Sequence, residues 1–117
     1  MQDESFENIN RDRTLRAIIE NVHWSSAEDP TGFVNYSLYI IDFVSGVIAR
    51  EHMQDTLDGS ILMADRDYGF DAHHWKKRSE RVIWPDRPPL LTRFEKEQLD
   101  QRITRQSIEY RRAFESR

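Results

Sequence analysis

The sequence contains no cysteine, which excludes disulfide bonds, thiolate metal centres and thiol nucleophiles. It has only four glycines, and none of them belongs to a phosphate-cradling motif. The longest apolar runs, at 38–41 and 61–64, are far shorter than the ~18 residues that a membrane-spanning helix needs. The first residues are acidic, unlike the basic start of a secretory signal. We therefore expect a cytoplasmic protein with no membrane span and no cofactor.

Charge is distributed unevenly along the chain, whose 117 residues are enough for one domain. Residues 1–74 carry 5 basic and 14 acidic side chains, whereas residues 75–117 carry 12 basic and 7 acidic ones. Two interpretations follow. The basic part folds back on the acidic part and neutralises it, or the acidic part is a docking surface for a basic partner.

The first regular element is predicted between residues 10 and 24. Leu15, Ile18, Ile19 and Val22 follow the spacing of one helical face, which favours an N-terminal helix. The second half of this segment also alternates between apolar and polar residues, so a strand is the alternative there. A cluster of turn-forming residues at 25–32 ends the element.

The middle of the chain predicts an antiparallel sheet of three or four strands. Residues 33–43 are rich in aromatic and β-branched side chains, and they form a hairpin with 47–49 across a turn that ends at Gly46. Short apolar segments at 60–64 and 81–84 are the further strands.

The C-terminal third predicts an extended connector and a long helix. Pro85, Pro88 and Pro89 keep residues 84–91 extended, and this segment is either a rigid spacer or a polyproline ligand. Thr92 and Glu95 have the spacing of a capping box, after which a helix runs from about 93 to 115. The predicted fold class is α+β in one domain: a body at 1–84, the connector at 85–91 and the helix at 92–117.

The long helix has one narrow apolar stripe with a polar residue at its centre. The stripe consists of Leu99, Ile103, Gln106, Tyr110 and Ala113. A polar stripe residue can specify register, which predicts a homodimer through Leu99, Ile103, Gln106 and Tyr110. The alternative is that the stripe covers the sheet. The helix also carries six arginines, but five acidic residues share it and no base-reading motif accompanies them, so we do not expect nucleic-acid binding.

The segment 65–74 holds the one cluster with ligand chemistry. It does not match a calcium loop, because Phe70 stands where glycine is required and Lys76 stands where an acid is required. His73 or His74 with Asp65 or Asp67 is the candidate pair for a metal-assisted hydrolase. The alternative is a polar loop in which the aspartates cap turns and the aromatic residues pack on the core.

By elimination, the sequence predicts a small non-enzymatic protein-binding regulator or inhibitor with an acidic surface. Tyrosines and carboxylates together make specific contacts, so the predicted partner surface is formed by Tyr36, Tyr39, Asp65, Asp67, Tyr68 and Asp71. The partner is expected to be a protein with a basic surface. A structural subunit anchored by its C-terminal helix and the hydrolase described above are the alternatives.

Overall fold

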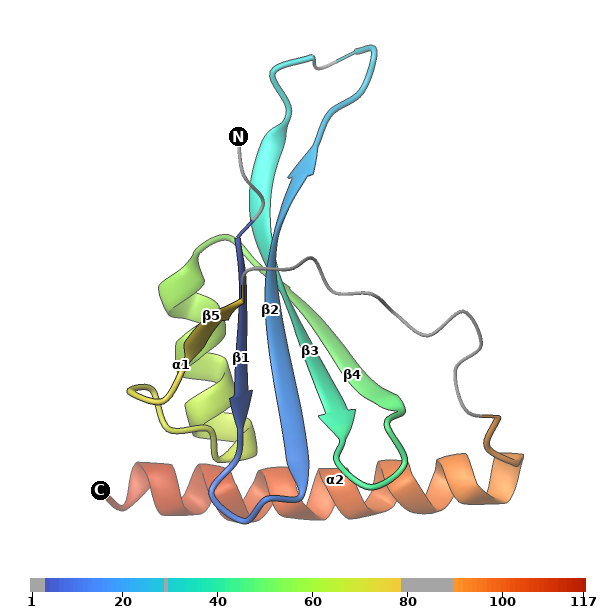
Figure 1. Cartoon of the computed structure of the whole chain (residues 1–117). Coiled ribbons are helices and arrows are strands. Elements are labelled where there is room, and N and C mark those ends of the chain that lie inside the picture. Colours follow the sequence, from blue (N-terminus) through green and yellow to red (C-terminus); the bar gives the residue numbers. More distant parts are fainter. Residues whose placement is uncertain (1–3, 29, 79–89) are drawn as a thin grey trace.

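The computed structural model describes residues 4–28, 30–78 and 90–117 (Figure 1). The architecture is α+β, as predicted. The elements in chain order are β1 (Ser5–Ile9), β2 (Leu15–Trp24), β3 (Phe33–Asp42), β4 (Ile48–Gln54), α1 (Leu57–Tyr68), β5 (Lys76–Arg78) and α2 (Arg93–Glu115). The strands form one sheet in the order β4-β3-β2-β1-β5, and every neighbouring pair is antiparallel.

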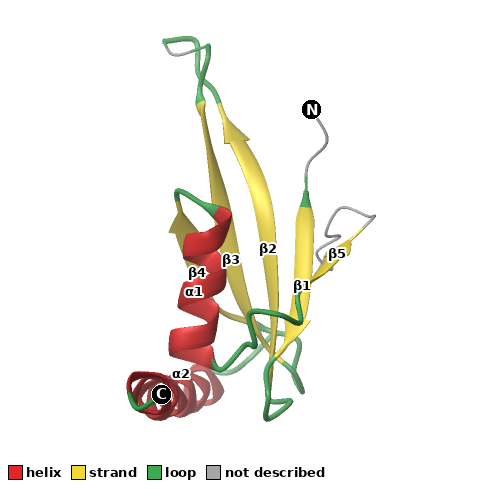
Figure 2. Ribbon diagram, turned by 90° about the vertical axis from the view of Figure 1, so that its left-hand side faces the viewer, coloured by secondary structure: helices red, strands yellow, loops and turns green. Residues whose placement is uncertain are grey.

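Both helices lie on one side of the sheet, α1 along it and α2 across its lower end (Figure 2). The core lies between this inner face and the helices. Leu15, Ala17 and Ile19 of β2 are buried there, together with Leu38 and Ile40 of β3. We call the opposite face, which points away from both helices, the outer face.

The predicted N-terminal helix is wrong, because residues 15–24 form β2. This strand lies between β1 and β3 and is buried on both sides: Leu15 and Ile19 point to the inner face and Ile18 to the outer face. A strand buried on both faces carries apolar residues at odd and even positions, and here they happen to fall at helical spacing. The alternation in the second half of the segment was the more informative pattern.

Two further strand predictions need correction. Residues 60–64 lie inside α1, whose first turn is capped by the Thr56 hydroxyl accepting a hydrogen bond from the Gly59 amide at 3.0 Å. Residues 58–59, just before the expected strand, therefore lie in the first turn of this helix. Residues 81–84, and the connector up to 89, lie outside the described residues. Among the described residues the sheet has five strands rather than three or four, since residues 5–9 and 76–78 also pair.

Two other predictions are confirmed. The hairpin of β3 and β4 turns through Gly46, where the Asp42 carboxylate accepts hydrogen bonds from the Ser45 amide and hydroxyl. Helix α2 begins at Arg93 behind a full capping box formed by Thr92 and Glu95. Among the described residues, no helix combines the length and the apolar character that crossing a bilayer requires.

The turn between β1 and β2 is organised by the buried side chain of Asn10. Its amide oxygen accepts hydrogen bonds from the backbone amides of Thr14 at 2.8 Å and Leu15 at 3.0 Å. Its amide nitrogen donates to the Thr14 hydroxyl at 3.0 Å, to the Tyr110 hydroxyl at 3.1 Å and to the Tyr68 carbonyl at 3.4 Å. One side chain therefore joins the turn to the end of α1 and to α2.

Tyr110 completes this junction from α2. Its hydroxyl donates to the Asp12 carboxylate, and its ring lies against Gly69, the left-handed residue that ends α1. Burial, followed by the hydrogen bond to Asp12, raises the pKa of Tyr110 to about 12, so the hydroxyl stays protonated at neutral pH.

Replacing Gly69 with alanine tests the contact with Tyr110. Gly69 has a φ of 75°, and a Cβ there would lie 2.6 Å from Cε1 of the Tyr110 ring. Gly46 has a φ of 74°, and no atom of the described residues lies within 4 Å of its Cβ position, so it is the matched control. Denaturant unfolding should show a loss of about 1–2 kcal/mol for Gly46→Ala and about 2–4 kcal/mol for Gly69→Ala. Equal losses would show that the Tyr110 ring moves aside at no cost.

Asn10→Asp tests the junction itself, because it keeps the shape of the side chain and removes its two N–H donors. We expect the free energy of unfolding to fall by about 2–4 kcal/mol, since three acceptors lose their donor in a buried site. Asn8→Asp is the control, because the Asn8 side chain donates only to the Asp71 carbonyl. A loss in Asn10→Asp no greater than that of the control would contradict the central role of Asn10.

Candidate functional site

Ion pairs hold α2 against the acidic body of the chain. Arg111 approaches Asp67 at 3.0 Å, Arg117 approaches Asp65 at 2.9 Å, and Arg102 pairs with Asp42. The three carboxylates are at most 10% exposed, so they are buried against their partners. The interpretation that the basic C-terminal part folds back on the acidic part is confirmed.

Each of these carboxylates has a lowered pKa. Burial raises the pKa of Asp65, but the hydrogen bonds from Arg117 and Arg11 outweigh burial and bring the pKa below its ordinary value. Burial likewise raises the pKa of Asp67, and the hydrogen bonds from Arg66 and Arg111 lower it further than burial raises it. Both groups are therefore ionised at neutral pH and committed to partners within the chain.

The residues of the predicted partner surface do not come together. Tyr36 points to the inner face of the sheet and Tyr39 to the outer face, because the two are an odd number of positions apart on β3. Asp65 and Asp67 are in internal ion pairs, and Tyr68 belongs to the core. Asp71 lies in the loop after α1. The role of these residues in partner binding stays a prediction, but they do not form one acidic face.

Four of the five stripe residues on α2 face the interior of their own chain, and Ala113 is exposed. Ile103 is fully buried in the core, Leu99 packs against the core, and Tyr110 bonds to Asn10. Gln106 lies between them, and its amide oxygen has no hydrogen-bond partner in the part of the chain that the structure describes. The alternative, that the stripe covers the sheet, holds only in part, because α2 crosses the lower end of the sheet and also packs against α1. A dimer through Leu99, Ile103, Gln106 and Tyr110 would need α2 to leave this site.

The segment 65–74 forms the end of α1 and a capped loop. The Asp71 carboxylate accepts a hydrogen bond from the His73 amide at 2.9 Å and lies 4.0 Å from the ring of His74. Phe70 is fully buried and packs against Trp75. Within residues 4–28, 30–78 and 90–117, no three His, Asp or Glu side chains are placed to hold a metal ion.

A histidine that the sequence did not single out has the shifted pKa. His52 of β4 lies 2.6 Å from the Tyr68 hydroxyl, and burial lowers its pKa below the ordinary value. The imidazole is therefore neutral at pH 7. The pair joins β4 to α1 beside a cavity of about 340 Å³ against α2, which is lined partly by Arg50, Thr104 and Arg111. Arg50 and Arg111 are engaged by Asp100 and Asp67, whereas Arg112 and Glu115, which also line the cavity, have no ion pair among the described residues.

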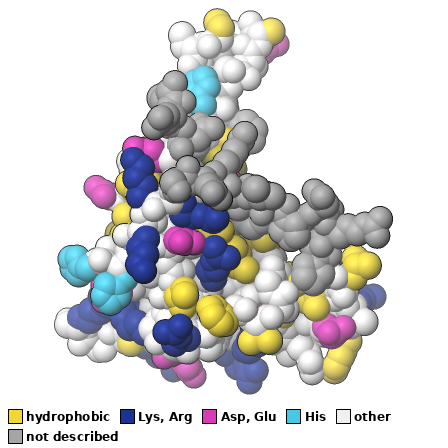
Figure 3. All heavy atoms as spheres, viewed as in Figure 1, with side chains coloured by type: hydrophobic (Ala, Val, Ile, Leu, Met, Phe, Trp, Pro, Cys, Tyr) yellow, Lys and Arg dark blue, Asp and Glu magenta, His cyan; other side chains and the backbone are white. Residues whose placement is uncertain are grey.

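The outer face carries a second and larger cavity, which we call the outer-face groove. Its volume is about 620 Å³. It is lined by Glu7, Asn8, Ile9, Arg13, Arg16, Phe43, His74 and Lys76. Figure 3 shows Lys and Arg side chains around a group of hydrophobic side chains on the lower part of this face.

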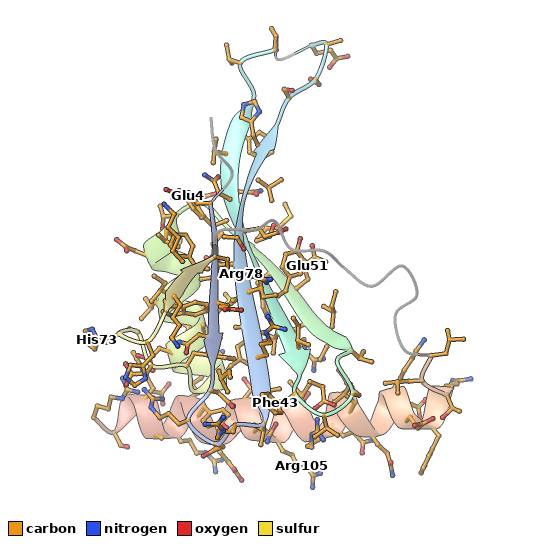
Figure 4. All side chains as sticks on the ribbon, in the orientation of Figure 1. Glu4, Phe43, Glu51, His73, Arg78 and Arg105 are labelled. Atoms are coloured by element: carbon orange, nitrogen blue, oxygen red, sulfur yellow. The ribbon has the colours of Figure 1, made fainter. Side chains whose placement is uncertain are left out.

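Three separate parts of the chain build the groove. The β1–β2 turn supplies Arg13, the end of β3 leads into Phe43, and β5 supplies Lys76 (Figure 4). The Phe43 amide donates to the Thr14 carbonyl at 3.0 Å, which fixes the backbone of Phe43 to the β1–β2 turn. The backbone segments that form the groove are therefore already joined by hydrogen bonds without a ligand.

We expect the ion pairs of α2 to make stability depend on acid. A carboxyl group with a lowered pKa contributes stability above its ordinary pKa of about 3.8, and the contribution is lost as pH falls through the lower, folded-state value. At pH 7 the free energy of unfolding of the double variant Arg111→Gln/Arg117→Gln should be about 1–3 kcal/mol lower than that of the wild type. As the pH falls from about 5 to about 3, the free energy of unfolding of the variant should decrease less than that of the wild type.

The matched control is Arg105→Gln/Arg112→Gln, which removes the same charge from the C-terminal part of the chain at residues that have no ion pair among the described residues. Denaturant unfolding across this pH range is the measurement. If both double variants have the same pH dependence, the ion pairs to Asp65 and Asp67 do not cause it.

No protein-family model, no characterised protein and no solved structure matches the chain. The outer-face groove is therefore interpreted from its own geometry and charge.

Proposed function

We propose that this chain is a non-enzymatic protein-binding module that acts as a regulator or inhibitor by occupying its partner. The observation that supports the proposal is the outer-face groove, where Phe43 is 44% exposed and Ile9 is 41% exposed beside a set of cations. Apolar anchors surrounded by polar and charged side chains are typical of protein-binding surfaces. A cytoplasmic location is part of the same proposal.

The surface differs from the acidic one that the sequence predicts. The carboxylates Asp65 and Asp67 are used inside the chain, whereas Arg13 and Lys76 have no ion pair among the described residues. The binding surface that we propose is therefore basic and apolar.

A protein is a better occupant of the groove than a nucleic acid. The chain has a net charge of −4, which repels a long polyanion outside the groove. Glu7 places a negative charge in the groove, and Phe43 and His74 are the two aromatic rings in its lining, whereas proteins that bind single strands line a longer groove with several stacking platforms. A short segment of a partner protein, unlike a long polyanion, would contact only the charges and the apolar side chains of the groove itself.

A second candidate function, a structural subunit anchored by α2, is favoured by the start of that helix. Residues 92–98 are all exposed, Phe94 is 66% exposed, and the helix extends past β4 (Figure 1). An unpacked helix end with an exposed aromatic residue can insert between neighbouring subunits. In this case Phe94→Ala, rather than a change in the groove, would abolish assembly.

Partner capture with matched charge variants tests the proposal. The full-length tagged chain is used as bait in lysate from the source cells, with and without nuclease treatment, and the retained proteins are quantified by mass spectrometry. Arg13→Glu/Lys76→Glu changes the groove. Arg105→Glu/Arg112→Glu makes the same change of charge on α2, where Arg105 projects from the side away from the sheet (Figure 4).

We expect a protein that the wild type and the α2 variant retain and that the groove variant loses by about tenfold or more. Equal retention by all three baits would contradict binding in the groove. Retention that disappears with nuclease treatment would contradict protein binding. A protein lost only in Phe94→Ala would favour the structural subunit instead.

A further inference from the structure

The outer-face groove has an excess of positive charge. Four cations lie in it or at its margin: Arg13, Arg16, Lys76 and Arg78. The single carboxylate of Glu7 accepts Arg16 at 2.9 Å and lies 3.7 Å from Arg78. The two remaining cations, Arg13 and Lys76, have no carboxylate partner in the described part of the chain. They are the charges that a ligand can neutralise without breaking an existing pair.

Arg13 is held in an unusual backbone conformation. Its φ is 57°, and it is the one residue other than glycine with a positive φ among those described. This left-handed conformation costs about 1–2 kcal/mol for a residue with a Cβ, and glycine adopts it freely. The turn enforces it, because Asn10 holds the backbone amides of Thr14 and Leu15, and the Arg13 amide donates to the Asn10 carbonyl at 3.0 Å.

The chain therefore carries an arginine where its own stability would favour a glycine. Strained residues of this kind are found preferentially at binding and catalytic sites, where the side chain is needed in that position. Here the strained residue lines a groove that has unpaired positive charge. Strain and charge are independent observations, and both indicate that the Arg13 guanidinium contacts a ligand.

We infer that the outer-face groove binds an acidic segment of a partner protein, with carboxylates paired to Arg13 and Lys76 and an apolar side chain packed against Phe43 and Ile9. This inference rests on the proposed function and adds the chemistry of the partner. Phe43 and Ile9 supply apolar contact, and the guanidinium of Arg13 suits the two oxygens of a carboxylate.

Arg13→Gly gives a sharp test, because it should separate binding from stability. Random short peptides displayed on phage are selected on the immobilised full-length protein, and the enriched peptide is synthesised with a fluorescent label. Its acidic residues are also replaced by Asn and Gln to give a neutral peptide of the same shape. Fluorescence anisotropy at low and physiological salt measures the binding of both peptides and of a single-stranded oligonucleotide.

We expect the enriched peptides to be acidic and to contain an aromatic or aliphatic residue. Arg13→Gly should weaken binding of the enriched peptide about tenfold, whereas its Tm equals or exceeds that of the wild type. Arg13→Asn, which also tolerates a positive φ, should behave like Arg13→Gly, and Arg105→Gln should bind like the wild type. Binding should also weaken as salt rises.

Other outcomes separate the two proposals. If the groove selects neutral or basic peptides, or if the neutral peptide binds as tightly as the acidic one, the partner chemistry is wrong and the protein-binding function stands. If lysate capture depends on the groove but no selected peptide does, the inference about the partner's chemistry fails and the protein-binding function stands. If the oligonucleotide binds in the groove more tightly than the enriched peptide, both proposals fail.

Discussion

The side chain of Asn10 makes the polar contacts on which the rest of the structure depends. Its five hydrogen bonds close the β1–β2 turn and reach both the carbonyl of Tyr68, at the end of α1, and the hydroxyl of Tyr110 on α2. A buried amide with all of its donors and acceptors satisfied specifies one arrangement, because any shift leaves a polar group without a partner. Ion pairs at Asp42, Asp65 and Asp67 then fasten α2 on either side of this point.

Local signals in the sequence were sufficient for the hairpin of β3 and β4 and for the start of α2, since a turn and a capping box depend on neighbouring residues. The element at 15–24 was predicted incorrectly because its periodicity depends on how many faces of the strand are buried, which is a property of the whole sheet. Residues 60–64 read as a strand because the apolar run is short, and the helix is revealed only by Thr56 before it and Gly69 after it.

The candidate site could not be predicted from the sequence, for a different reason. Charge asymmetry was visible, but which carboxylates remain free depends on which arginines reach them, and Asp65 is paired with residues 54 positions before it and 52 positions after it. The groove likewise joins the β1–β2 turn, the end of β3 and the start of β5. The one local clue would have been Arg13 in a tight turn, and its positive φ follows only from the buried Asn10.

The same turn serves the junction with α2 and presents Arg13 to the groove, so the two are thermodynamically linked. A ligand that prefers the ordered turn must also stabilise the docked form of α2, and release of α2 must weaken that ligand by the same factor. Occupancy of the groove would then slow amide hydrogen exchange around Ile103 and Tyr110, on the other side of the sheet. If the proposed partner binds in the groove, slower amide exchange in α2 would reveal that it is bound.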